Sequence, residues 1–72
     1  MYLYQRLRDL REDEDKTQQV IADFLKISRP HYQLYESGKR QIPFDKVIQL
    51  AKYYNVSIDY IAGLTNDKSK KW

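Results

Sequence analysis

The feature that most constrains the fold is a series of helix-start signals. Thr17, Ser28 and Ser57 each precede a short segment with apolar residues at helical spacing. A Ser or Thr hydroxyl at such a position accepts a hydrogen bond from an otherwise unpaired backbone N–H. Pro30 falls in the first turn after Ser28, where its missing N–H costs nothing. No stretch alternates apolar and polar residues for long enough to indicate a strand, so the sequence predicts an all-α fold.

Apolar residues recur at helical spacing between these signals and define one face of each expected helix. Gly38, Asn55 and Gly63 stand where a left-handed residue would end a helix. A short fifth helix follows Ser57. The apolar faces are expected to contain Leu3, Leu7 and Leu10 in residues 2–14, Ile21, Phe24 and Leu25 in residues 18–25, Tyr32 and Tyr35 after Ser28, and Phe44, Val47, Ile48, Ala51 and Tyr54 in the fourth helix.

Size and charge set further limits. The 72 residues suffice for one small domain, and without cysteine no disulfide or cysteine zinc site can stabilise it. The net charge is +3, and positive charge is concentrated in residues 16–40, which also sum to +3. This balance is compatible with nucleic-acid binding and equally with an ordinary solvated surface.

Several function classes lack support in the sequence. His31 is the single histidine and has no partners at metal-binding spacing. No nucleophile–base pair or cofactor motif is present, so we expect neither an enzyme nor a bound metal, cofactor or small-molecule ligand. No run of about 18 apolar residues indicates a membrane span, and no signal peptide is recognisable, so a cytoplasmic location is expected.

The order of short motifs along the chain is more specific than any of them alone. "TQ" opens the second expected helix, "IS" precedes the third, "YESGKR" closes it and "LAKYYNVSIDYIAGL" follows. Together they resemble the Cro/lambda-repressor (XRE) family of helix-turn-helix proteins. The resemblance implies a compact five-helix domain over residues 1–64 with a central helix-turn-helix. Residues 65–72 form a polar, basic tail that we expect to fray.

The resemblance also assigns the faces of the third helix, about Arg29–Ser37. It places Tyr32 in the core, turns Tyr35 and Glu36 toward the scaffold, and implies that this helix enters the DNA major groove. Arginine can pair with guanine and glutamine with adenine, and leucine can contact a thymine methyl group. The expected base contacts are Arg29, Pro30, His31, Gln33 and Leu34.

Further residues are expected to bind DNA phosphates. Gln18 matches the family's phosphate-binding glutamine at the start of the second helix, where backbone N–H groups attract anions. Lys26 replaces a glycine that is usual in the family, and a left-handed conformation there would cost about 1 kcal/mol relative to glycine. The full set of expected phosphate contacts is Thr17, Gln18, Lys26, Ser28, Lys39 and Arg40.

The resulting interpretation is a sequence-specific double-stranded DNA-binding transcriptional regulator. We expect a repressor that binds a two-fold-symmetric operator as a homodimer, because one such module reads only a half-site. The expected dimer surface contains Ile58, Tyr60, Ile61 and Leu64. The alternative is a protein-interaction module on the same fold, like an antitoxin or a coactivator, for which the apolar Pro30 and Leu34 are the supporting residues.

Overall fold

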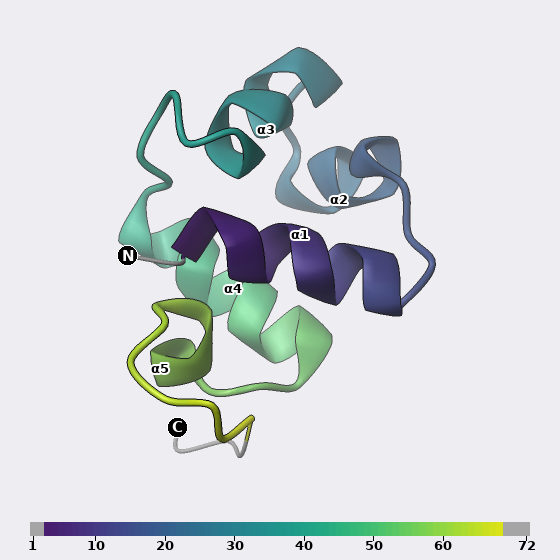
Figure 1. The fold of residues 1–72 in the computed structure, drawn as a ribbon. Coiled ribbons are helices and arrows are strands. Elements are labelled where there is room, and N and C mark those ends of the chain that lie inside the picture. Colours follow the sequence, from purple (N-terminus) through teal and green to yellow (C-terminus); the bar gives the residue numbers. More distant parts are fainter. Residues whose placement is uncertain (1–2, 69–72) are drawn as a thin grey trace.

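The computed structural model describes residues 3–68, with side chains from Gln5 onward, and five helices lie in this range (Figure 1). The predicted all-α fold is confirmed, and residues 3–68 contain no strand. No helix in this range is long and apolar enough to cross a membrane. The helices are α1 (Leu3–Asp13), α2 (Gln18–Leu25), α3 (Arg29–Glu36), α4 (Phe44–Tyr54) and α5 (Ile58–Ile61).

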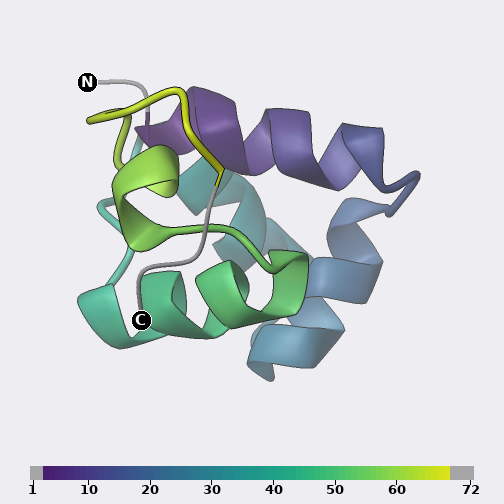
Figure 2. The same cartoon turned by 90° about the horizontal axis from the view of Figure 1, so that it is seen from below.

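The helices form two groups that meet along α1. The two helices of the helix-turn-helix, α2 and α3, pack against each other, and α3 also packs against α1. On the other side, α5 packs against both α4 and α1. Figure 1 shows α2 and α3 to one side of α1 and α5 to the other, and Figure 2 shows α1 and α4 at opposite edges of the turned view. The first helix therefore connects both groups.

The predicted helix starts are confirmed. The side-chain oxygens of Thr17, Ser28 and Ser57 each accept a hydrogen bond from the backbone N–H three residues later, at 3.2, 3.2 and 3.0 Å. All three residues have extended backbone angles, as N-cap residues do. The direction in which each of these helices leaves its preceding loop is thus fixed by local chemistry.

The helix ends use left-handed residues, and three of these, Asp15, Lys26 and Asn55, are not glycine. Gly38 and Gly63 have φ values of 80° and 79°, as their positions predict. Asn55 ends α4 at φ 61°, and Lys26 ends α2 at the same φ. Asparagine tolerates this conformation better than lysine, because its short polar side chain can bond locally. The turn between α2 and α3 therefore keeps the left-handed geometry at a cost of about 1 kcal/mol relative to glycine.

One core spans both groups of helices. Three predicted core residues lie elsewhere: Phe24 is 40% exposed, Phe44 is 65% exposed and Ile48 is only half-buried. Phe44 is the first residue of α4. The ring of Phe24 packs against Tyr53 in a tilted arrangement, with ring centroids 4.6 Å apart. The side chain of Leu3 lies outside the described part. The buried apolar residues are Leu7, Leu10, Ile21, Ala22, Leu25, Tyr32, Tyr35, Ile42, Val47, Leu50, Ala51, Tyr54, Val56 and Ile61.

The start of the predicted tail is held against the domain. Arg6 donates hydrogen bonds to the carbonyl oxygens of Tyr60 and Thr65, both at 3.0 Å, and to the side-chain oxygen of Asn66 at 2.8 Å. The Arg6 guanidinium also lies 4.2 Å from the centroid of the Tyr60 ring. We call these four residues the Arg6 cluster. Ser57 also donates hydrogen bonds to the carbonyl oxygens of residues 67 and 68, from its hydroxyl and its backbone N–H. The expectation of a frayed tail is thus wrong for residues 65–68, while residues 69–72 lie outside the described part.

Candidate nucleic-acid interface

The third helix has one buried and one exposed side. Tyr32 and Tyr35 are buried in the core at 0% and 2% exposure. Arg29, Pro30 and Gln33 are exposed. The spacing accounts for the shared face of Tyr32 and Tyr35, since positions three apart lie on one face of a helix. Arg29 lies three positions before Tyr32 but is exposed, and it is the first residue of the helix. Of the expected base-contact residues, His31 and Leu34 are only half-buried, so all five keep surface that a partner can reach.

The exposed side begins at a rigid helix start. The Ser28 hydroxyl accepts from the backbone N–H of His31, and Pro30 occupies the first turn. Arg29 stands at the first position of the helix, and its side chain forms no hydrogen bond or ion pair with other residues of the described chain. Its guanidinium therefore keeps all its donors for an external acceptor.

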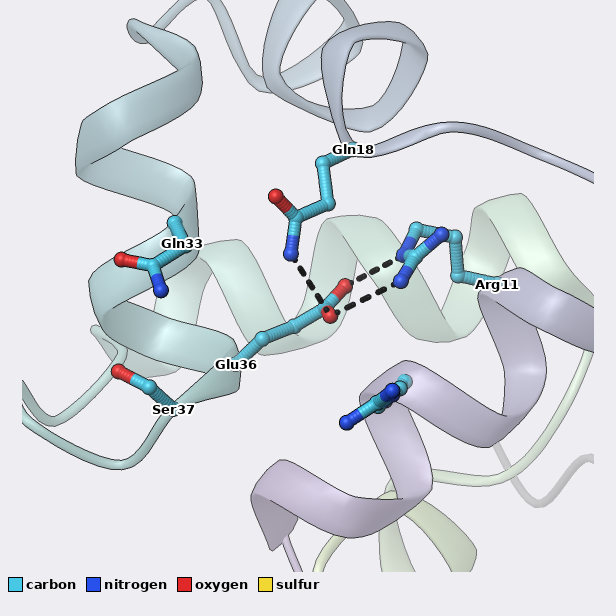
Figure 3. A pocket seen from close by; sticks show the side chains of 6 residues that line it. Arg11, Gln18, Gln33, Glu36 and Ser37 are labelled. Carbon is cyan, nitrogen blue, oxygen red and sulfur yellow. Dashed lines mark hydrogen bonds and ion pairs between the residues drawn. The ribbon is translucent and has the colours of Figure 1, made fainter.

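The other end of the third helix is fixed by a buried ion pair. The Nε and Nη2 atoms of Arg11 lie 2.7 and 3.2 Å from the two carboxylate oxygens of Glu36, a two-point contact (Figure 3). The side chains are only 13% and 4% exposed. Gln18 donates to the same carboxylate at 3.2 Å, and Arg11 also donates to the carbonyl oxygen of Lys16 at 2.9 Å. We call Arg11, Gln18 and Glu36 the Arg11 cluster, which joins α1, the start of α2 and the end of α3.

The charges in the Arg11 cluster stabilise each other. Burial alone would raise the pKa of Glu36, but hydrogen bonds from Arg11 and Gln18 hold this pKa below its usual value. The hydrogen bond to Glu36 likewise raises the pKa of Arg11. Glu36 is therefore ionised at neutral pH and acts in the scaffold. This agrees with the scaffold-facing position that the resemblance implied.

Gln18 shows how the cluster changes one expectation from the sequence. Its side-chain amide, expected to contact a phosphate, donates to Glu36 instead (Figure 3). The Thr17 and Ser28 hydroxyls accept backbone bonds at their helix starts. These three residues shape the helix N-termini, while their side chains already have partners inside the chain.

A shallow pocket of about 200 Å³ lies beside the Arg11 cluster. Its walls come from α1, the start of α2 and α3 (Figure 3). The lining residues are Arg8, Arg11, Gln18, Gln33, Glu36 and Ser37. Arg8 is bonded to Glu12 at 3.2 Å, whereas the Gln33 side chain forms no hydrogen bond within the described chain. The pocket thus borders the exposed face of the third helix with a mostly polar wall.

Exposed cations flank the third helix on both sides in the sequence. Lys26 lies in the turn before it, and Lys39 and Arg40 lie in the loop after it. None of these side chains forms an ion pair with the described residues. By contrast, the arginines of α1 are bonded within the chain, Arg6 and Arg11 in their clusters and Arg8 to Glu12. Lys26, Lys39 and Arg40 thus leave three cations without an internal ion pair in the turn before and the loop after the third helix, and Lys46 of α4 is a further such cation away from this helix.

The four residues expected at a dimer surface differ in exposure. Leu64 is 78% exposed, and Ile58 and Tyr60 are half-buried. Ile61 has no exposed surface and packs in the core of its own chain. Its assignment to an intermolecular surface is therefore incorrect. Ile61 is the last residue of the one-turn helix α5, and its side chain packs in the core.

The sequence profile of a family described as "Helix-turn-helix" matches residues 7–61, which include most of α1 and all of α2 to α5. The chain belongs to this helix-turn-helix family. It is of the XRE type, so the predicted resemblance is confirmed. The helix-turn-helix motif itself consists of α2, the turn at Lys26 and α3. The family match extends well beyond this motif and includes most of the described residues.

Helix-turn-helix relatives with regulator names occur in two bacteria. The uncharacterized HTH-type transcriptional regulator YobD of Bacillus subtilis is 42% identical over 67 residues, which cover 93% of this chain and 60% of the relative. The HTH-type transcriptional regulator ImmR of the same organism is 35% identical over 71 residues, which cover 99% of this chain and 55% of the relative. The cryptic phage CTXphi transcriptional repressor RstR of Vibrio cholerae is 34% identical over 53 residues, covering 74% of this chain and 48% of the relative.

The chain thus spans only about half to three fifths of the length of these helix-turn-helix relatives. No solved structure matches it at a comparable level. The matched relatives are named as regulators or repressors, which confirms the expectation of a non-enzymatic class.

Proposed function

We propose that this chain is the DNA-binding domain of a transcriptional regulator, most simply a repressor that acts as a homodimer on a two-fold-symmetric operator. The observation that carries this proposal is the third helix: its exposed side begins with Arg29, which has no internal partner, while its far end is fixed through Glu36. A rigid helix with free donors on its outer face suits the major groove. The names of the relatives support the same reading.

Sequence reading is assigned to the outer face of the third helix. Arg29 would donate two hydrogen bonds to guanine, and Gln33 would pair with adenine. Pro30 and Leu34 would contact thymine methyl groups, and His31 would contact a base edge or a phosphate. One good two-point contact discriminates between bases by about 1–3 kcal/mol, so loss of Arg29 should relax one position rather than abolish binding.

Phosphate binding is assigned to the exposed cations around this helix and to the helix starts. Lys26, Lys39 and Arg40 would place the protein on the duplex without reading its sequence. The backbone N–H groups at the starts of α2 and α3 would add to this, with Thr17, Gln18 and Ser28 shaping those starts. Affinity should therefore fall with rising salt concentration.

A second copy is proposed because one domain of this size reads too little DNA. A single small module buries about 600–1,000 Å² on DNA and reads half of a symmetric site. Leu64 supplies exposed apolar surface next to α5, and Ile58 and Tyr60 lie close by in the chain. We place the dimer contact at these three residues and the site of action in the cytoplasm.

The test is selection from a random duplex library near 0.15 M salt with wild type, Arg29→Ala and Arg40→Ala. Both variants lose one positive charge. We expect wild type to enrich a two-fold-symmetric site, Arg29→Ala to lose one guanine position, and Arg40→Ala to bind all sequences more weakly with an unchanged preference. If wild type enriches no sequence above charge-driven binding, the proposal is overturned. The alternative of a protein-interaction module would then be tested, with a protein partner that binds the Pro30–Leu34 surface.

A further inference from the structure

A hydrogen bond joins the exposed and buried sides of the third helix. The Tyr35 hydroxyl lies 2.9 Å from Nε2 of His31, one helical turn earlier. The two rings are tilted, with their centroids 5.0 Å apart. Tyr35 is buried at 2% exposure, whereas His31 is half-buried and lies among the residues proposed to read DNA. A core residue thus holds the ring of a candidate contact residue.

The positions of the protons in this pair follow from the available partners. A tyrosine hydroxyl has one proton to donate, and a neutral imidazole has one donor nitrogen and one acceptor nitrogen. Within the described chain, the Tyr35 hydroxyl has no other hydrogen-bond partner than His31. The buried hydroxyl is best satisfied if it donates to Nε2. The imidazole proton of the neutral ring must then be on Nδ1, which has no partner in the described chain.

We propose that Tyr35 is a positioning residue that fixes His31 as a hydrogen-bond donor at Nδ1 toward DNA. This inference rests on the proposed DNA-binding function and specifies one of its contacts. A donor at Nδ1 can bond to guanine O6 or N7, adenine N7, thymine O4 or a phosphate oxygen. It cannot bond to the amino groups of adenine or cytosine, which are themselves donors. The contact made by His31 therefore has a defined polarity that its sequence position alone does not give.

Removal of the Tyr35 hydroxyl should release that polarity. In a Tyr35→Phe variant the ring can still fill the core, but Nε2 of His31 loses its donor. The imidazole is then free to rotate and to carry its proton on either nitrogen. Nδ1 can act as an acceptor in part of the molecules, so amino groups of bases become acceptable partners.

The first arm of the test is ¹⁵N NMR of the His31 ring in the free protein at a pH where the ring is neutral. We expect wild type to carry the proton on Nδ1, and Tyr35→Phe to show both tautomers. Tyr54→Phe is the matched control, since it removes another buried tyrosine hydroxyl on a different helix and should leave the His31 signals unchanged. A wild-type spectrum with the proton on Nε2 overturns the inference without any variant.

The second arm measures base preference by selection with wild type, Tyr35→Phe, His31→Ala and the double variant. Tyr35→Phe should lower discrimination at one base pair by about three- to tenfold, the size expected for one hydrogen bond. In the His31→Ala background the same change should have no further effect, because Tyr35 acts through His31. A merely structural role would change binding equally in both backgrounds.

The outcomes separate this inference from the proposed function. If wild type enriches a site and Tyr35→Phe leaves its preference unchanged, the inference fails and the DNA-binding function stands. An equal effect of Tyr35→Phe in the His31→Ala background also overturns the inference. If wild type enriches no site, the proposed function fails, and the role of Tyr35 in DNA reading fails with it.

Discussion

The Arg11 and Arg6 clusters sit toward opposite ends of the same helix and join it to different parts of the chain. Arg11 binds a carboxylate that is almost fully buried, and so ties the helix-turn-helix together. Arg6 binds two carbonyl oxygens, an amide oxygen and an aromatic face, and so ties α5 and residues 65–66 to α1. The first cluster is ionic and the second has uncharged acceptors. Two arginines five positions apart can therefore differ in their contribution to stability and in their response to pH.

The largest effect is expected from removal of the buried guanidinium. Arg11→Met leaves the Glu36 carboxylate buried without its main partner, which should lower the free energy of unfolding by about 3–5 kcal/mol. Arg8→Met is the matched control, because the Arg8–Glu12 pair is more than half exposed on both sides and should contribute at most about 0.5 kcal/mol. Urea unfolding followed by circular dichroism measures both. Equal losses in the two variants would contradict the structural role of the Arg11 cluster.

A smaller loss is expected in the Arg6 cluster. Arg6→Met removes three hydrogen bonds and the contact with the Tyr60 ring, but the freed carbonyl groups can turn to water. We expect a loss of about 1–3 kcal/mol in the same urea experiment. Hydrogen exchange should rise mainly in α5 and residues 65–68 and stay low in α3. Increased exchange in α3 of similar size would show that the two clusters are not separate.

The pH dependence should distinguish the two clusters next. The pKa of Glu36 is lower in the folded state than its unfolded value of about 4.3. Its contribution to stability is therefore fully present above about pH 4.3 and is lost as the pH falls through the folded-state pKa. Glu36→Gln should lose this part of the acid slope, measured as unfolding free energy against pH. Arg6→Met should keep the wild-type slope, since the Arg6 cluster contains no carboxylate.

The smallest effects are expected at the left-handed helix ends. Lys26→Gly should raise the unfolding free energy by up to about 1 kcal/mol, because glycine adopts φ near 61° without a Cβ clash. Asn55→Gly, at the same φ in the other half of the molecule, should gain only a few tenths of a kcal/mol, since asparagine already tolerates this conformation. Thermal unfolding measures both changes. A greater gain at Asn55 would refute the strain assigned to Lys26.

Local features of the fold were easier to predict from the sequence than contacts between helices. Helix starts at Thr17, Ser28 and Ser57 were predictable, because a cap depends on residues three positions apart. The positions of Phe24 and Phe44 were predicted wrongly, since helical spacing gives the direction of a side chain but not where the neighbouring helix ends. The same lack of neighbour information explains why Ile61 was placed on an outer surface.

The candidate site was predictable in part. The buried and exposed sides of the third helix followed from its spacing and from the family resemblance, and the scaffold-facing position of Glu36 is confirmed. The structural roles of Arg11 and Arg6 were missed, because their partners lie 25 and more than 50 positions away in the sequence. The first helix contains three arginines, and nothing in their spacing distinguishes these two from Arg8. The one available signal was the spacing of Glu36, which lies four positions after the core residue Tyr32 and therefore shares its face of α3.

The division of the third helix into a packed side and an exposed side has a consequence for how such a chain can diversify. Glu36 in its last turn and Tyr32 and Tyr35 on its inner side carry the packing. Arg29, Pro30 and Gln33 are exposed to solvent. The outer residues can be exchanged without disturbing the residues that hold the helix in place. New binding preferences can therefore arise by single substitutions that each leave a folded protein. Evolution of a different preference does not require unstable intermediate variants.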